Sequence, residues 1–233
     1  MEKSSILFLS AGNSPYLNNL KRLANNLRKF EPNCRFHVWD LGLGEKNVEE
    51  FKREFPWVEV KRFPFENYPD YFRLDVRHAG EWVWKPVIIN LEAQEYDGLM
   101  FWMDSANLLN RPMDWERNFL SENGIYTPHS DGNLTKWIHP KVWEYLKIPE
   151  HFRGPYHMRT AGLVGMDLSK GYVKEFTKEW SDLAQDINAI APPGADRSNS
   201  RQDQSIMTYV YWKLFDREGF MRYDHQVSAR VHQ

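Results

Sequence analysis

The sequence has 233 residues, 42% of them hydrophobic and 27% charged, which is typical of one globular domain. The formal net charge is -2 and no basic block is present, so nucleic acid is not expected as a partner. A single cysteine, Cys34, excludes an internal disulfide, and no apolar stretch is long enough for a signal peptide or a membrane span, so a cytoplasmic location is expected.

The first hundred residues alternate between predicted strands and predicted helices. Short apolar runs followed by turn-forming residues indicate strands, and apolar residues three and four positions apart indicate helices. This alternation predicts an α/β fold with a mostly parallel central sheet and helices on both faces. The expected strands are 6–9, 35–41, 58–63 and 99–103, and the expected helices are about 15–27, 45–55 and 84–96.

The second half of the chain is less regular, and no linker divides it from the first. The longest apolar pattern at helical spacing runs from about Gly171 to Ile190. The stretch 191–202 is rich in Pro, Gly, Ser and Asn and is expected to be a loop. We therefore expect a single domain over 1–233. The other expected elements here are strands at 125–128 and 160–166 and helices at 140–146 and 203–215.

Polar residues follow three of the predicted parallel strands. In open parallel sheets, ligands bind beyond the carboxyl ends of the strands, so the loop 10–14, Asp40 and the stretch 104–107 should share one edge. Asp104 stands out, because a carboxylate after five apolar residues is costly unless something positive or hydrogen-bonding meets it. A divalent cation on a diphosphate would do so, and a turn cap is the alternative.

Two further charged residues open predicted helices. Lys85 could reach a bound phosphate, or it could be an ordinary surface lysine. Asp203 could face a substrate, or it could simply favour the positive end of its helix. His225 is kept as an extra metal or phosphate contact. The sequence has no dinucleotide-binding, P-loop or serine-hydrolase motif.

Four motifs, in this order, resemble those of GT-A fold glycosyltransferases. They are VWDLGL at 38–43, WKP at 84–86, LMFWMDS at 99–105 and RQDQS at 201–205. The resemblance implies a hexosyl- or pentosyltransferase that moves a sugar from a nucleoside-diphosphate donor, expected to be a UDP-sugar, to a glycan or another hydroxyl acceptor.

The resemblance also implies two halves and a set of site residues. Residues 1–107 would form the nucleotide-binding half and 108–233 the acceptor-side half. The expected catalytic residues are Asp203 and Gln204. The expected donor-binding residues are Ser10, Ala11, Gly12, Asn13, Asp40, Lys85, Asp104, Ser105 and Asn107. The residues expected on the sugar or acceptor side are Trp82, Thr160, Ala161 and Gly162.

The motif that would hold a metal ion is incomplete. Asp104 matches the first carboxylate of an Asp-x-Asp motif, but the second position is Ala106. A divalent cation, Mn²⁺ or Mg²⁺, is expected on Asp104, with His225 as a weaker candidate. Either Asn107 or water substitutes for the second carboxylate, or the dependence on metal is weaker or absent. This cation or Lys85 would stabilise the leaving diphosphate. Asp203 would be the base of an inverting enzyme; in a retaining one, Asp203 or Gln204 would steady the sugar.

Two other functions compete with sugar transfer. The ten tryptophans are compatible with a carbohydrate-binding module without catalysis, and an α/β scaffold is also compatible with a sugar nucleotidyltransferase. The position of the tryptophans distinguishes a carbohydrate-binding module from a transferase, because a binding module would expose them. We expect Trp84, Trp102 and Trp180 in the core. The tryptophans expected in loops or short elements near the acceptor side are Trp82, Trp115, Trp137 and Trp143.

Overall fold

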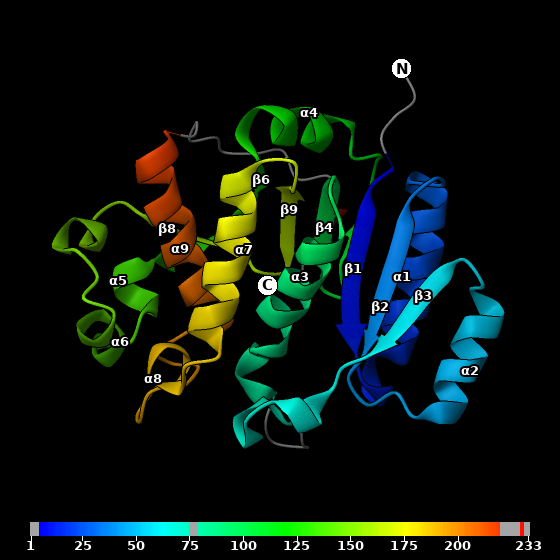
Figure 1. Ribbon diagram of the computed structural model, residues 1–233, viewed down its shortest axis with the longest axis horizontal. Helices are drawn as coiled ribbons and strands as arrows, with labels where there is room; N and C mark the ends of the chain where they lie inside the picture. The colour runs from blue at the N-terminus through cyan, green and yellow to red at the C-terminus, as the bar shows by residue number, and fades with distance from the viewer. Residues whose placement is uncertain (1–4, 75–78, 220–228, 231–233) are drawn as a thin grey trace.

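A six-stranded central sheet lies between helices on both faces (Figure 1), in a computed structural model that describes residues 5–74, 79–219 and 229–230. The strand order is β3-β2-β1-β4-β9-β6. The first four strands are parallel, while β9 is antiparallel to both β4 and β6. The predicted mostly parallel sheet is therefore confirmed. The strands are β1 (Leu7–Gly12), β2 (Arg35–Asp40), β3 (Val58–Arg62), β4 (Leu99–Met103), β6 (Ile125–Tyr126) and β9 (Leu163–Asp167).

The helices divide between two buried clusters, one on each face of the sheet. Successive residues of a strand point to opposite faces, so Phe8 packs with α1, α2 and α4, whereas Leu9 packs with α3, α7 and α9. The five apolar residues of β4 are covered on both faces, as predicted. These helices are α1 (Leu17–Phe30), α2 (Glu45–Glu54), α3 (Trp84–Glu95), α4 (Asp114–Asn123), α7 (Gly171–Ala184) and α9 (Asp203–Glu218).

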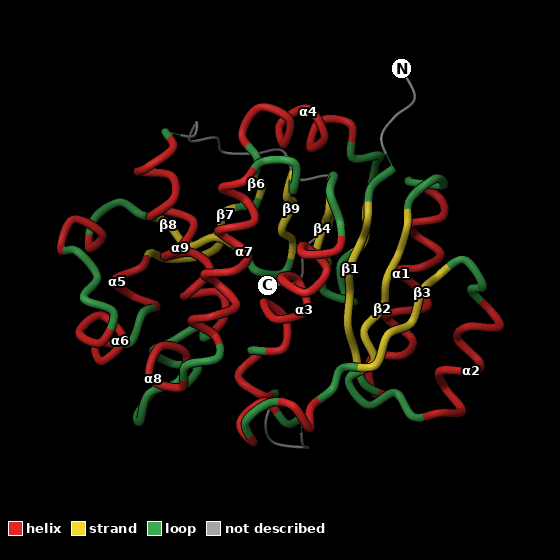
Figure 2. Tube along the Cα trace, viewed as in Figure 1, coloured by secondary structure: helices red, strands yellow, loops and turns green. Residues whose placement is uncertain are grey.

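Smaller elements from the second half gather beside the main sheet. Figure 2 shows the antiparallel pair β7 (His129–Asn133) and β8 (His157–Arg159) outside it. No described helix is long and apolar enough to cross a membrane. The other short pieces are β5 (Leu108–Leu109), β10 (Ala229–Arg230), α5 (Leu134–Trp137), α6 (Pro140–Tyr145), α8 (Ile187–Ile190), and 3-10 turns at Ser14–Tyr16, Phe65–Asn67, Asp70–Phe72, Gly80–Trp82 and Glu150–Arg153.

Several predicted boundaries are wrong, and three of them affect the segments that border the sheet edge and the loop 191–202. β1 continues through Ser10, Ala11 and Gly12, expected in a loop, because they pair with Val38, Trp39 and Asp40 of β2. The helix expected to reach residue 190 ends at Ala184, and Asp186 caps a separate helix by accepting from the Asn188 amide at 3.0 Å. The strand expected from Thr160 begins only at Leu163.

Candidate active site

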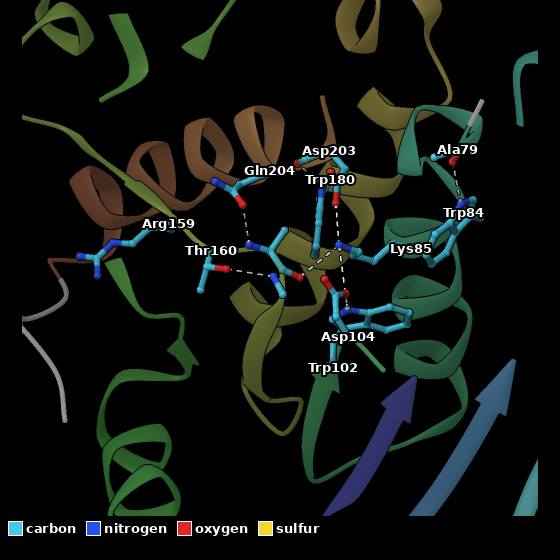
Figure 3. Close-up of polar contacts among 12 residues, drawn as sticks. Ala79, Trp84, Lys85, Trp102, Asp104, Arg159, Thr160, Trp180, Asp203 and Gln204 are labelled. Atoms are coloured by element: carbon cyan, nitrogen blue, oxygen red, sulfur yellow. Dashed lines mark hydrogen bonds and ion pairs between the residues drawn. The ribbon is translucent and has the colours of Figure 1, made fainter. Parts of the chain in front are cut away.

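Lys85, Asp104 and Asp203 form a cluster that we call the charged triad (Figure 3). Lys85 Nζ lies 3.3 Å from Asp104 Oδ1 and 3.0 Å from Asp203 Oδ2, and it donates to the Ala161 carbonyl at 3.4 Å. The side chains of Lys85 and Asp203 are only 4% and 7% exposed, whereas that of Asp104 is 39% exposed. Asp104 is therefore the member of the triad that a ligand reaches first.

The triad is assembled at element boundaries. Lys85 lies in the first turn of α3, Asp104 directly follows β4, and Asp203 is the first residue of α9. Trp102 Nε1 donates to Asp104 Oδ1 at 2.7 Å, and Trp180 Nε1 donates to the Asp203 carbonyl at 3.0 Å. Both acidic residues are thus held from the core by indole groups.

Burial and charge shift the proton affinities of the triad in a defined way. Burial raises the pKa of Asp203 from its ordinary 3.8 to about 6, although Lys85 pulls it down. Burial alone would lower the pKa of Lys85, but the carboxylates of Asp104 and Asp203 outweigh it and raise that pKa. The triad therefore pairs a permanently charged ammonium with a carboxyl group that titrates near neutral pH, as expected of a group that exchanges protons with a substrate.

The segment 160–162 lies against the triad. The Gly162 carbonyl accepts from the Asp104 amide at 2.9 Å and from Asn107 Nδ2 at 2.5 Å. Thr160 Oγ1 accepts from the Gly162 amide at 3.2 Å. A β-carbon on Gly162 would lie only 3.2 Å from Asp104 Oδ2, so glycine permits this close approach. Thr160, Ala161 and Gly162, three of the four residues expected on the sugar side, thus lie against the triad.

Gln204 also points to this segment, as Figure 3 shows. Its Oε1 accepts from the Ala161 amide at 3.4 Å, and its Nε2 donates to Ser130 Oγ of β7 at 3.2 Å. Sequence reasoning missed Ser130 and the hydrogen bond from Trp102. The spacing of Trp102 and Asp104 was the available signal, because residues two apart along a strand lie on one face.

The expected donor-binding residues in β1 and β2 lie at the carboxyl edge of the sheet, but they do not contact the charged triad. Ser10 and Ala11 are buried strand residues rather than loop residues. Asp40 Oδ1 accepts from the amides of Gly42 and Leu43 at 2.7 and 2.5 Å, so this oxygen shapes its own turn. Ser105 is buried as well.

The tryptophans are mostly core residues. Trp84, Trp102 and Trp180 are buried, as predicted. Trp137 and Trp143, expected near the acceptor side, are buried too, and Trp115 packs in α4 with its ring centroid 5.2 Å from that of Phe119. Trp82 is half-buried. The described tryptophans therefore do not form the exposed platform that a carbohydrate-binding module needs.

Strained backbone lies on both sides of the triad. Glu81 and Trp82, before Lys85, have φ angles of 48° and 57°, and Gln202, before Asp203, has φ 39°. Such angles are uncommon outside glycine, and they gather at functional sites, where the surrounding structure maintains them.

Within the charged triad, Asp104 offers a carboxylate oxygen to a cation. Asp104 Oδ1 is engaged by Trp102 and Lys85, while Oδ2 has no hydrogen-bond partner among the described residues. Within 5–74, 79–219 and 229–230, no three His, Cys, Asp or Glu residues gather to hold a metal ion, and His225 lies outside these ranges. This fits an ion that arrives with a diphosphate, which would supply most ligands, and does not fit a resident metal centre.

Comparison with sequence families leaves the activity open. A family model described as a protein of unknown function (DUF1647) matches residues 1–90. A search of curated proteins found no match.

Solved glycosyltransferases share the fold. The galactosyltransferase LgtC, in complex with donor and acceptor sugar analogues, matches with a TM-score of 0.52 and 16% identity over 88% of this chain and 70% of LgtC. The bifunctional glycosyltransferase WbbM matches with a TM-score of 0.56 and 13% identity, over 90% of this chain and 38% of WbbM. GlyE of Streptococcus pneumoniae matches with a TM-score of 0.55 and 10% identity, over 90% of this chain and 44% of GlyE. The chain thus has the GT-A-type fold, and it spans less than half of WbbM and GlyE.

Proposed function

We propose that this protein is a glycosyltransferase that moves a sugar from a nucleoside-diphosphate donor, a UDP-sugar as first choice, to a hydroxyl of a glycan or similar acceptor. The charged triad carries the proposal. It lies at the carboxyl edge of the sheet, where ligands of such folds bind, and it combines an ammonium with a carboxyl group of raised pKa.

Lys85 would interact both with the leaving diphosphate and with the carboxylate of Asp203. Departure of the diphosphate develops negative charge, which the ammonium stabilises, while the anomeric carbon becomes cationic. In an inverting reaction Asp203 takes the proton of the attacking hydroxyl. Lys85 then loses one negative partner just as the leaving group gains charge, so proton transfer strengthens its interaction with the diphosphate.

A retaining reaction would use the same residues differently. Asp203 or Gln204 would then steady the sugar rather than remove a proton. Gln204 is suitably held between Ala161 and Ser130. One of the similar structures is an active-site glutamine-to-glutamate variant of LgtC, so an active-site glutamine has a precedent in this fold. The stereochemistry of the product distinguishes the two reactions.

The divalent cation remains a proposal tied to Asp104. We infer that Mn²⁺ or Mg²⁺ would enter as a complex with the donor diphosphate and would add positive charge there. Asp104 Oδ2 would be its described protein ligand. Isothermal titration of UDP with Mn²⁺ and with a chelator should show a metal-dependent gain in affinity that Asp104→Ala removes. An equal gain in both proteins would reject Asp104 as a ligand.

The proposed function is tested by nucleotide binding and by transfer. UDP should raise the unfolding temperature, and Asp104→Ala should stay folded but lose transfer from a UDP-sugar. Asp97→Ala is the matched control, because Asp97 is 74% exposed and pairs only with Lys174 among the described residues. If no nucleoside diphosphate shifts the transition at millimolar concentration, the proposal fails. Glycan binding without nucleotide binding would instead favour a carbohydrate-binding module.

A further inference from the structure

The loop 191–202 carries two arginines that stack on tryptophans beside the charged triad. The Arg197 guanidinium lies 4.8 Å from the ring centroid of Trp82, which precedes Lys85 in the chain. The Arg201 guanidinium lies 4.0 Å from that of Trp137, and Arg201 precedes Asp203. The two stacks are therefore close to the triad along the chain, one just before Lys85 and the other just before Asp203.

Neither of these guanidinium groups has a carboxylate partner among the described residues. Some other exposed arginines do: Arg62 pairs with Glu66 at 2.6 Å, and Arg217 pairs with Glu175 at 2.7 Å. Asp196, the acidic side chain of the loop, is hydrogen-bonded to Ser198 of the same loop. The two arginines thus keep their charge and their hydrogen-bond donors available to a ligand.

Further positive charge lies around the same loop. Lys136 Nζ is 4.8 Å from the Trp137 ring centroid, and Lys141 Nζ donates to the Pro193 carbonyl at 2.8 Å. Asp131, an exposed acidic neighbour, lies 3.4 Å from Lys136. The four cations named around this loop thus outnumber its two carboxylates, Asp131 and Asp196, in a chain whose formal net charge is -2.

Stacking also prepares the guanidinium for a ligand. A planar guanidinium on an indole face keeps its N–H edge free, and less rotamer freedom is lost when that edge binds. The edge matches the paired oxygens of a carboxylate, sulfate or phosphate, with two parallel hydrogen bonds. Two such groups beside one site indicate a ligand with anionic groups.

We propose that the acceptor is an acidic glycan and that Arg197 and Arg201 bind its carboxylate or sulfate groups. This inference rests on the proposed function. Arg201 stacks on Trp137 of α5, and Figure 1 shows α5 at the opposite end of the molecule from β2 and β3, so this arginine lies away from the strand that carries Asp40. Ser205 Oγ, which donates to the Trp137 carbonyl, ties this side to α9.

Titration calorimetry with matched oligosaccharides tests the inference. One pair is a short oligogalacturonate and its carboxyl-reduced counterpart, and the other is a sulfated oligosaccharide and its desulfated counterpart. The protein should prefer at least one acidic member by about ten-fold or more, because hydrogen bonds between charged groups are stronger than neutral ones. Added salt should weaken that binding and leave the neutral probes unaffected.

Variants locate the effect. Arg197→Gln and Arg201→Gln should each lose about ten-fold in affinity for the preferred acidic probe and keep their affinity for UDP, and Arg201→Lys should recover only part of the loss. Arg28→Gln is the matched control, because Arg28 is exposed and stacks on Trp57 at 5.1 Å in the first half of the chain. It should bind the probe normally, and melting curves should show all four variants folded.

Each remaining outcome overturns the inference. Equal binding of acidic and neutral members, or no binding of either acidic probe at millimolar concentration, rejects an acidic acceptor. A ten-fold loss of UDP affinity in the arginine variants would assign them to the donor diphosphate instead. If wild-type protein binds UDP but shows no preference for acidic probes, only the acidic acceptor is rejected. If it binds no nucleoside diphosphate, the proposed function is rejected as well.

Discussion

Asp203 makes the stability of the protein depend on pH. Its pKa is raised by burial to about 6 in the folded chain, against an ordinary 3.8. Between these values the folded state holds a proton that the unfolded state has released, so stability falls as pH rises through this window. The free energy of unfolding is lowered by an amount on the order of 3 kcal/mol, which is fully present above pH about 6 and absent below about 4. The fold thus tolerates an ionised Asp203 at a cost.

We predict that transfer activity follows the ionisation of Asp203. If Asp203 is the base, kcat/KM of the wild-type enzyme should rise with pH and level off above about 6, because only the carboxylate accepts a proton. Asp203→Asn should lose most of the activity and the pH-dependent rise. A pH–rate profile measured with a UDP-sugar is the test. A flat wild-type profile between pH 5 and 8 would exclude Asp203 as the base.

The close approach of Gly162 to the triad gives a second prediction. In Gly162→Ala the new β-carbon would lie 3.2 Å from Asp104 Oδ2 and 3.4 Å from Thr160 Oγ1, so the Asp104 carboxylate must shift by a few tenths of an ångström. Transfer activity should fall by a few-fold, since a displacement of ~1 Å at a reacting centre can cost ~100-fold and this shift is smaller. Gly171→Ala, with nothing within 4 Å of its β-carbon, is the control and should keep full activity. Equal activities would show that this contact is unimportant.

At the scale of elements, α3 is fixed to the sheet through a buried carboxylate. Glu92 accepts from His37 Nδ1 at 3.0 Å and Trp39 Nε1 at 2.8 Å, and it lies 3.0 Å from Lys61 Nζ. Burial alone would raise the pKa of Glu92, but His37, Lys61 and Trp39 outweigh burial and lower it. Because Lys85 opens the same helix, this anchor also positions the ammonium of the triad.

We predict that Glu92→Gln destabilises the protein by about 2 kcal/mol at neutral pH, because it removes the buried carboxylate that accepts from His37 and Trp39 and pairs with Lys61. The lowered pKa means that Glu92 stabilises above its unfolded value of 4.5 and that this contribution disappears as pH falls. Urea unfolding at pH 7 and pH 4 should show the difference between wild type and variant shrinking with acid. Glu59→Gln is the control, since Glu59 is 52% exposed, and its effect should stay under about 1 kcal/mol. A pH-independent difference would contradict this account.

The sequence predicted those elements whose apolar pattern is continuous. β4 and the inner face of α1 belong to this group. α4 was missed, because its buried Glu116 and Asn123 interrupt the apolar face. The extension of β1 was missed for a similar reason: Ser10 is polar yet fully buried, and only its pairing with β2 reveals a strand. Local pattern fails where a polar residue is buried by tertiary contacts.

On the scale of the whole molecule, the central sheet joins both halves of the chain. β4 from the first half pairs with β9 from the second over five residues, Leu99↔Asp167 to Met103↔Leu163. The triad is divided in the same way, with Lys85 and Asp104 before residue 107 and Asp203 after it. The site therefore requires both halves to be folded onto one another.

We predict that the chain unfolds in a single cooperative transition. Urea curves followed by far-ultraviolet and near-ultraviolet circular dichroism should coincide, because a shared sheet gives neither half an independent core. UDP should shift the entire curve. Two separated transitions would instead show that 1–107 and 108–233 fold as independent units.

The composition of the site was only partly predictable. Asp104 followed from its position at a strand end, and Lys85 and Asp203 from helix starts and from the resemblance. Their mutual pairing could not be predicted, because nothing local in the sequence links α3 to α9. The stacks of Arg197 and Arg201 on tryptophans were hidden for the same reason. Sequence pattern identifies which residues border a sheet edge, and only the fold determines which of them meet.

The burial of Asp203 has a consequence for laboratory evolution. Because its carboxylate lowers stability at neutral pH, a library selected only for resistance to heat should accumulate uncharged residues at this position. The selected variants would be more stable to heat but inactive. A library selected for turnover should keep the carboxylate and acquire its compensating substitutions elsewhere in the core. Sequences recovered from the two selections would therefore diverge first at position 203.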